Sequence, residues 1–122
     1  MKKILIADDE QDALGVLEKK LTQHGYSVTA VTNATDALRC AQQDKPDLML
    51  LDIVMPDMDG YALASALKQD GALKGVPIIF ITGQDLLPKG IEKRMAELGA
   101  YNYIMKPCAF EDILAKVKAA LG

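Results

Sequence analysis

Polar residues that can ligate a metal ion or react with phosphate stand at the ends of four short apolar segments. They are Asp8 and Asp9 after the first segment, Asp52 after the third, Thr82 after the fourth and Lys106 after the fifth. Three carboxylates brought together repel one another and need a hard cation, for which Mg²⁺ is suited. A hydroxyl and an ammonium group facing the same point would stabilise a developing phosphoryl group. The set predicts phosphoryl transfer to a carboxylate.

Each of these residues also has a simpler interpretation. The acidic run Asp8-Asp9-Glu10 could cap the helix that follows it, and alone this is about as good an interpretation as metal binding. Asp52 could simply belong to a loop, Thr82 could be an ordinary strand end, and Lys106 with Pro107 could form a turn. The occurrence of one such group at each of several segment ends favours a shared site.

The elements that must position these residues alternate between segments with the hydrophobic pattern of a strand and segments with that of a helix. Apolar segments of strand length lie at Lys3 to Ala7, Ser27 to Val31, Leu48 to Leu51, Pro77 to Ile81 and Tyr101 to Met105. Apolar residues at helical spacing follow each segment, including Leu14, Leu17 and Leu21, and later Ile91, Met95 and Leu98. The order predicts a strand followed by a helix, five times.

This alternation predicts an α/β fold with a doubly wound, five-stranded parallel sheet covered by helices on both faces. The segments Leu48 to Leu51 and Ile78 to Ile81 are continuously apolar, which indicates interior strands. The segment Ser27 to Val31 alternates, which indicates an edge strand. Ligands of such sheets bind beyond the carboxyl ends of the strands, where the polar residues lie. No linker interrupts residues 1–122, so we expect a single domain.

Composition excludes several other classes of protein. A net charge of -3 without a run of Lys or Arg argues against direct nucleic-acid binding. The longest apolar stretches fall far short of the roughly 20 residues of a membrane helix, and the start of the chain does not resemble a secretory signal. Cys40 and Cys108 form no metal-binding pattern, so we expect reduced thiols in a cytoplasmic protein.

Four separated motifs carry a resemblance to a known family. They are Asp8-Asp9, the segment from Asp52 to Gly60, Thr82-Gly83 and Lys106-Pro107. In this order they resemble the receiver domains of two-component signalling response regulators, over the whole chain and most closely the single-domain chemotaxis type. The resemblance implies the flavodoxin-like receiver fold with strand order 2-1-3-4-5.

The resemblance also implies a role for individual residues. Asp52 would be the phosphoacceptor, and Asp8, Asp9, Asp52 and the backbone carbonyl of Val54 would hold Mg²⁺. Lys106 would contact the phosphoryl group, Thr82 would hydrogen-bond to it, and Tyr103 would turn inward as Thr82 moves. The Lys106-Pro107 bond would be cis, and Gly60 would let the preceding loop turn tightly. The variable positions Val54 and Gln84 leave the lifetime of the phosphorylated state open.

By the same resemblance the phosphoryl donor would be a sensor histidine kinase or a phosphotransfer protein. The downstream protein would bind a face formed by the helix around Ile91, Arg94 and Met95, the strand that contains Tyr103 and the last helix. The domain would catalyse only its own phosphorylation and dephosphorylation, and would not otherwise be an enzyme.

Three alternatives compete with this interpretation. A phosphatase resembling the haloacid dehalogenase group would need a second Asp two residues after the nucleophile, where this chain has Val54. A flavin-binding module would need a phosphate loop after the first strand, where Asp8, Asp9 and Glu10 would repel phosphate. The chain could also be a receiver cut from a longer kinase or transcription factor.

Overall fold

The computed structural model describes residues 1–83, 102–106 and 108–121. Within these ranges, only the backbone is described for Thr82, Gly83, Asn102, Met105 and Lys106. The predicted helix around Ile91, Met95 and Leu98 and the predicted cis bond at Pro107 lie outside the described residues.

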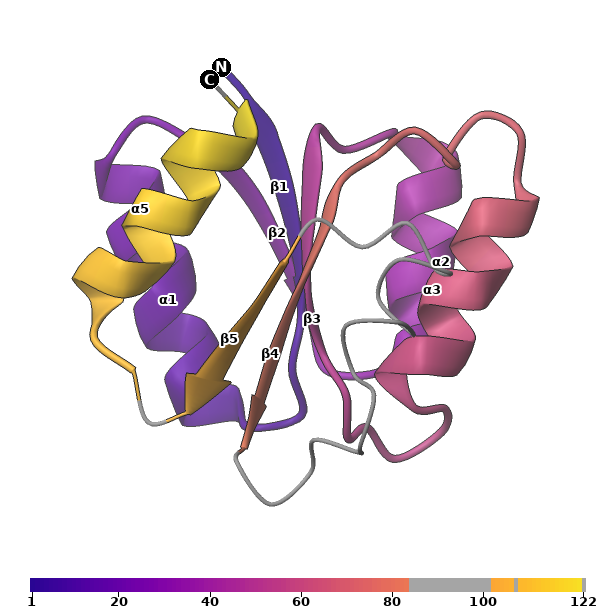
Figure 1. Cartoon of the computed structure of the whole chain (residues 1–122), viewed down its shortest axis with the longest axis horizontal. Coiled ribbons are helices and arrows are strands. Elements are labelled where there is room, and N and C mark those ends of the chain that lie inside the picture. Colours follow the sequence, from indigo (N-terminus) through magenta and orange to yellow (C-terminus); the bar gives the residue numbers. More distant parts are fainter. Residues whose placement is uncertain (84–101, 107, 122) are drawn as a thin grey trace.

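A parallel five-stranded sheet in the order β2-β1-β3-β4-β5 forms the centre of the molecule (Figure 1). Its strands are β1 (Lys3–Ala7), β2 (Ser27–Val31), β3 (Leu48–Asp52), β4 (Ile78–Gly83) and β5 (Asn102–Lys106). The predicted fold class, strand order and edge position of β2 are confirmed. Along the chain, strands are added first on one side of β1 and then on the other. The carboxyl ends of β1 and β3 therefore lie side by side where this order reverses.

Helices cover both faces of the sheet. In the described part of the chain these are α1 (Gln11–Gln23), α2 (Ala34–Gln43), α3 (Gly60–Gln69) and α5 (Phe110–Leu121). Figure 1 shows α1 and α5 on one face and α2 and α3 on the other. The protein is therefore a three-layer sandwich, as the alternating periods predict.

Alternating strand residues supply a separate core to each face. In β1, Ile4 and Ile6 join the cluster beneath α1 and α5, whereas Leu5 and Ala7 join the cluster beneath α2 and α3. The five residues of β3 are all buried, which is why its sequence is continuously apolar up to Asp52. Burial on both faces makes these strands a rigid platform for the residues at their ends.

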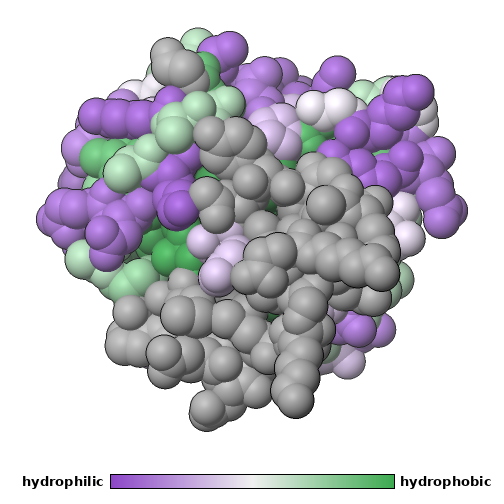
Figure 2. Space-filling view, in the orientation of Figure 1, coloured by the Kyte–Doolittle hydropathy of each residue, from purple (hydrophilic) through white to green (hydrophobic). Residues whose placement is uncertain are grey.

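The surface of the described helices is more hydrophilic than the core. The described helices present mainly hydrophilic residues in the view of Figure 2, and hydrophobic residues show there in smaller patches. No helix in the described part of the chain is long and apolar enough to cross a membrane.

Three strands are one or two residues longer at their carboxyl ends than their apolar segments predict. Asp52 pairs with Ile81, and Gly83 pairs with Lys106, so the sheet ladder continues through the polar residues. The physical reason is that backbone pairing does not depend on side-chain hydropathy. The candidate site residues Asp52, Thr82 and Lys106 therefore have sheet backbone.

The loop between β3 and α3 folds tightly against the end of β3. The Gly60 N–H donates a hydrogen bond of 2.7 Å to the Ile53 carbonyl, which closes the loop at its base. A Cβ on Gly60 would lie 2.9 Å from the Ile53 Cα and 3.1 Å from the Asp52 carbonyl carbon. Glycine is therefore required here by a close approach between two backbone segments.

Gly60→Ala is expected to lower the free energy of unfolding by roughly 1–3 kcal/mol, because backbone atoms must shift to admit a methyl group. Gly15→Ala is the matched control: Gly15 lies in α1, and apart from the backbone of its own helix nothing lies within 4 Å of an added Cβ. That variant should gain about 0.5–1 kcal/mol from helix propensity. Urea unfolding measures both, and equal stability of the two variants would contradict the close approach.

Candidate functional site

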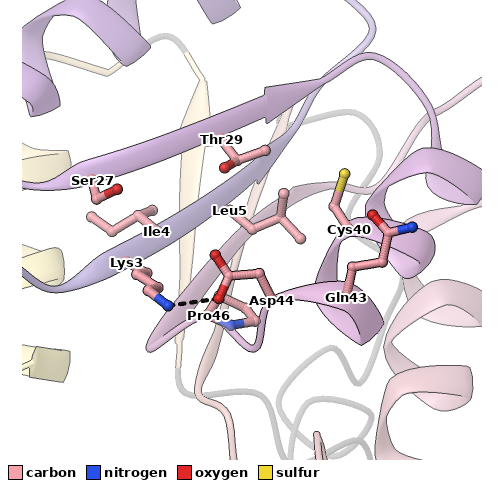
Figure 3. A pocket seen from close by; sticks show the side chains of 9 residues that line it. All are labelled: Lys3, Ile4, Leu5, Ser27, Thr29, Cys40, Gln43, Asp44 and Pro46. Carbon is pink, nitrogen blue, oxygen red and sulfur yellow. Dashed lines mark hydrogen bonds and ion pairs between the residues drawn. The ribbon is translucent and has the colours of Figure 1, made fainter.

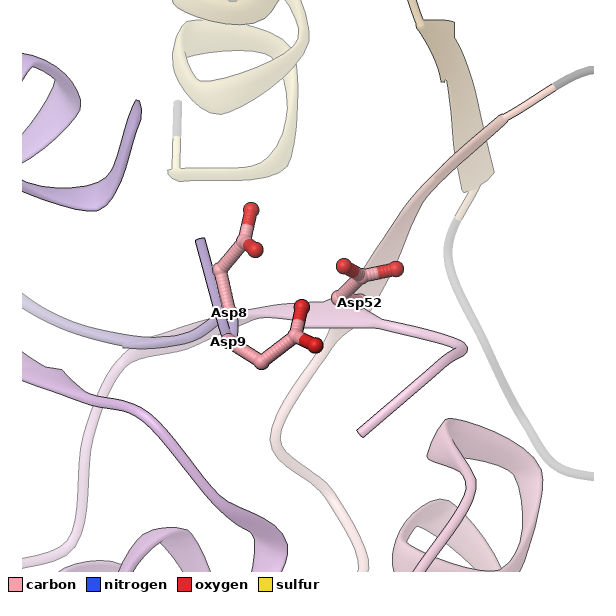
Figure 4. Close-up of side chains that lie close together, drawn as sticks. All are labelled: Asp8, Asp9 and Asp52. Carbon is pink, nitrogen blue, oxygen red and sulfur yellow. The ribbon is translucent and has the colours of Figure 1, made fainter. Parts of the chain in front are cut away.

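Three carboxylates from two neighbouring strands converge at the carboxyl edge of the sheet. Asp8 and Asp9 directly follow β1, and Asp52 is the last residue of β3. One carboxylate oxygen from each lies within 4.8 Å of the others. Figure 4 shows the three side chains side by side. The structure thus brings together the acidic residues that the sequence predicts to share a site.

Two members of this acidic cluster are buried. Asp8 is 6% exposed and Asp52 is 5% exposed, and they are the buried polar side chains of the described part of the chain. Asp8 Oδ1 accepts a hydrogen bond of 3.0 Å from the Glu10 N–H, and Asp52 Oδ1 accepts one of 3.3 Å from the Val54 N–H. Burial of carboxylates next to a third one is unfavourable without a compensating cation.

Helix capping does not account for the acidic run. The N-cap residue of α1 is Glu10, and its side chain makes no capping hydrogen bond. Asp8 and Asp9 precede the cap, and their oxygens approach Asp52 across the sheet. The geometry therefore favours a ligand site over the simpler interpretation.

The donor atoms of the cluster fit a hard divalent cation. All are carboxylate oxygens, the ligand type that Mg²⁺ and Ca²⁺ prefer, and no softer nitrogen or sulfur donor belongs to the set. Val54 is 47% exposed and lies beside Asp52. Its backbone carbonyl remains a predicted additional ligand.

The other predicted site residues lie at the same edge of the sheet. The backbone of Thr82 pairs with Met105 near the end of β4, and Lys106 ends β5. Their side chains lie outside the described part of the structure, so their predicted contacts stay predictions. Tyr103 is half-buried and packs against the core beneath α2 and α3.

A hollow of about 740 Å³ adjoins the acidic cluster on the side of α1 and α5. Its lining includes the charged residues Asp8 and Glu10 and the apolar residues Val16, Leu17 and Phe110. A smaller pocket of about 140 Å³ lies at the opposite edge of the sheet, beside the ion pair of Lys3 and Asp44 (Figure 3). The larger hollow is therefore the one continuous with the candidate site.

Asp57 contributes a feature that the sequence does not reveal. Its Oδ1 accepts a hydrogen bond of 2.9 Å from the Ala34 N–H, and its Oδ2 accepts bonds of 2.9 and 2.6 Å from the Thr35 N–H and hydroxyl. Asn33 caps the next amide of α2, that of Asp36, at 2.8 Å. The loop after β3 is thereby bound to the N-terminus of α2. Its partners lie 22 and 23 residues away, so no local pattern signals the contact.

These hydrogen bonds lower the pKa of Asp57 to about 2, with the Thr35 hydroxyl the largest cause and the Ala34 and Thr35 amides next. The folded-state pKa lies below that of an unfolded aspartate, about 3.9. The contribution of Asp57 to stability is therefore complete above the unfolded value and is lost as the pH falls toward about 2.

Asp57→Asn should accordingly reduce the decline in stability on acidification, because the amide does not titrate. Urea unfolding midpoints of wild type and variant, measured from about pH 5 to pH 2, would show the difference. A variant with the full wild-type pH dependence would show that Asp57 is not held by these bonds in solution.

Comparison with known proteins places this geometry in a family. The model of the response regulator receiver domain matches residues 4–118. The alkaline phosphatase synthesis transcriptional regulatory protein PhoP of Bacillus subtilis is 36% identical over 121 residues, covering 98% of this chain and 48% of PhoP. Protein PilH of Pseudomonas aeruginosa is 35% identical over 123 residues, covering 100% of this chain and 99% of PilH. The solved structure of the chemotaxis protein CheY4 of Vibrio cholerae superposes with a TM-score of 0.92 at 26% identity, covering 99% of both chains.

The chain spans about half the length of several curated regulators that it matches, PhoP among them. The family match nevertheless covers nearly all of the present sequence, and the CheY4 structure agrees with it in fold. The chain belongs to the response regulator receiver domain family of two-component signalling.

Proposed function

We propose that this chain is a phosphorylation-activated receiver in which Asp52 accepts a phosphoryl group in a Mg²⁺-dependent reaction. The observation that carries the proposal is the burial of Asp8 and Asp52 close to each other and to Asp9 at the ends of two adjacent strands. In the reaction a carboxylate oxygen of Asp52 bonds to phosphorus while the bond between phosphorus and the donor breaks. The donor is a histidine kinase or a phosphotransfer protein.

Mg²⁺ would be held by Asp8, Asp9 and Asp52, with the Val54 carbonyl as a further ligand. When bound, the ion neutralises the negative charge of the carboxylates and of the incoming phosphoryl group. Lys106 and Thr82, at the ends of β5 and β4, are the residues we assign to contact with that group. Their place at the same edge of the sheet as Asp52 supports the assignment.

The domain is proposed to act on itself and not to turn over external phosphate esters. Hydrolysis by an aspartate nucleophile needs a second acid or base close by. Two residues after Asp52 stands Val54, whose side chain cannot transfer a proton. We also propose a cytoplasmic location, with which the absence of a disulfide at Cys40 and Cys108 is in keeping.

The output is proposed to be a change in a protein-binding face that includes β5 and α5. A phosphoryl group adds roughly two negative charges beside Asp52 and biases a pre-existing equilibrium between two states. Tyr103 is suitably placed to report it, since it is half-buried over the core on the α2 and α3 side. A downstream protein would bind this face. We expect no direct contact with nucleic acid.

Asp52→Asn is expected to abolish phosphorylation by acetyl phosphate in Mg²⁺, because an amide cannot accept the group. Intact-mass spectrometry would show a phosphorylated peak for wild type and none for the variant. Asp47→Asn is the matched control, since Asp47 immediately precedes the same strand and is exposed. A phosphorylated peak of wild-type size in Asp52→Asn would overturn the assignment.

Asp9→Asn should raise stability in EDTA and weaken Mg²⁺ binding, because it removes one of three repelling charges. The gain without metal should be roughly 1 kcal/mol, as expected for partly solvated charges at this separation. Urea unfolding in EDTA and in Mg²⁺, together with titration calorimetry, would measure both effects. Unchanged Mg²⁺ affinity would exclude Asp9 as a ligand.

A further inference from the structure

The loop between β3 and α3, residues 53–59, contacts the proposed site through the Val54 N–H, yet much of it is exposed. Val54, Pro56 and Asp57 are exposed, whereas Ile53 and Met55 are buried in the core. Its base is closed by the bond between the Gly60 N–H and the Ile53 carbonyl. The outer part of the loop therefore needs a separate attachment to hold one conformation.

Asp57 provides that attachment through the N-terminus of α2. Its carboxylate accepts three hydrogen bonds from Ala34 and Thr35 at 2.6 to 2.9 Å. The first amides of a helix have no partner within the helix and carry partial positive charge, so a carboxylate is well suited to them. We call this set of three bonds the Asp57 clamp.

The clamp acts on a part of the loop that adjoins the phosphoacceptor. The Val54 N–H donates to Asp52 Oδ1 at 3.3 Å, slightly longer than most N–H···O bonds, so a small movement of the loop would break the bond. Val54 lies three residues before Asp57. Only Met55 and Pro56 stand between them, so we expect a displaced Asp57 to strain the backbone beside the phosphoacceptor as well.

We propose that Asp57 is a positioning residue for the metal and phosphoryl site, acting through its clamp on the N-terminus of α2. This inference rests on the proposed function, because it takes Asp52 and the Val54 backbone as parts of that site. It implies that occupation of the site and closure of the clamp stabilise each other. Such coupling is reciprocal: Mg²⁺ should tighten the clamp by the same factor by which the clamp tightens Mg²⁺ binding.

Loss of charge must be separated from loss of position. Asp57→Asn removes one charge and turns an amino group toward the amides of α2, which are themselves donors. Asp59→Asn is its matched control: it removes the same charge from the same loop. Asp59 caps α3 by accepting from the Ala62 N–H at 2.7 Å, and Asn caps a helix about as well as Asp. Thr35→Val removes the hydroxyl bond to Asp57 without any change of charge or of the loop sequence.

Titration calorimetry with Mg²⁺ at fixed ionic strength provides the first test. We expect the dissociation constant to rise about five- to tenfold in Asp57→Asn, at the lower end of usual coupling strengths. It should rise about threefold in Thr35→Val, as expected for one hydrogen bond, and less than about twofold in Asp59→Asn, whose lost charge is screened by solvent. If Asp57→Asn and Asp59→Asn weaken Mg²⁺ binding equally, the loss of one negative charge explains the effect, and the proposal is overturned.

Amide hydrogen exchange provides a second test. If Asp57 only capped α2, Mg²⁺ would not change the exchange rates of the capped amides. In wild type, Mg²⁺ should slow exchange at Ala34 and Thr35, and this slowing should disappear in Asp57→Asn. If wild type binds Mg²⁺ without any change at these two amides, the coupling does not exist and the inference is wrong. If wild type does not bind Mg²⁺ at all, the proposed function itself fails, and the inference fails with it.

Discussion

The placement of three carboxylates within 4.8 Å of one another, two of them buried, is the constraint on which the rest of the molecule depends. Such an arrangement opposes folding by repulsion and by loss of hydration. It persists because Asp8 and Asp52 extend from strands that pair directly with each other and are buried on both faces. The apolar core thus holds in place a site that would not assemble by itself.

The parallel sheet explains why residues far apart in the sequence meet. Every strand directs its carboxyl end to the same edge, and the order β2-β1-β3-β4-β5 makes β1 and β3 neighbours. Helices on both faces then exclude water from the strands while leaving this edge accessible. The hollow beside Asp8 and Glu10 extends from that edge between α1 and α5. Scaffold and site are consequences of one topology.

Three interactions of different kinds hold the loop after β3 in place. Gly60 permits a close backbone approach, Asp59 caps α3, and Asp57 binds the N-terminus of α2. Each satisfies a steric or hydrogen-bonding requirement of the backbone, and each restricts a segment that adjoins Asp52. An exposed loop can then have a defined conformation without a hydrophobic core of its own.

The sequence by itself determined the alternation of strands and helices, the burial of β3 and the edge position of β2, because these follow from hydrophobic period. It also predicted that Asp8, Asp9 and Asp52 share one place, since carboxylates gathered at the ends of buried strands are unfavourable unless a ligand compensates their charge. The resemblance already implied a tight turn at Gly60, and the tertiary structure showed which atoms it approaches, those of the Asp52 and Ile53 backbone. Only the tertiary structure decided that Asp57 binds α2. That contact depends on how separate elements pack, and the types and spacing of residues near Asp57 carry no record of that packing.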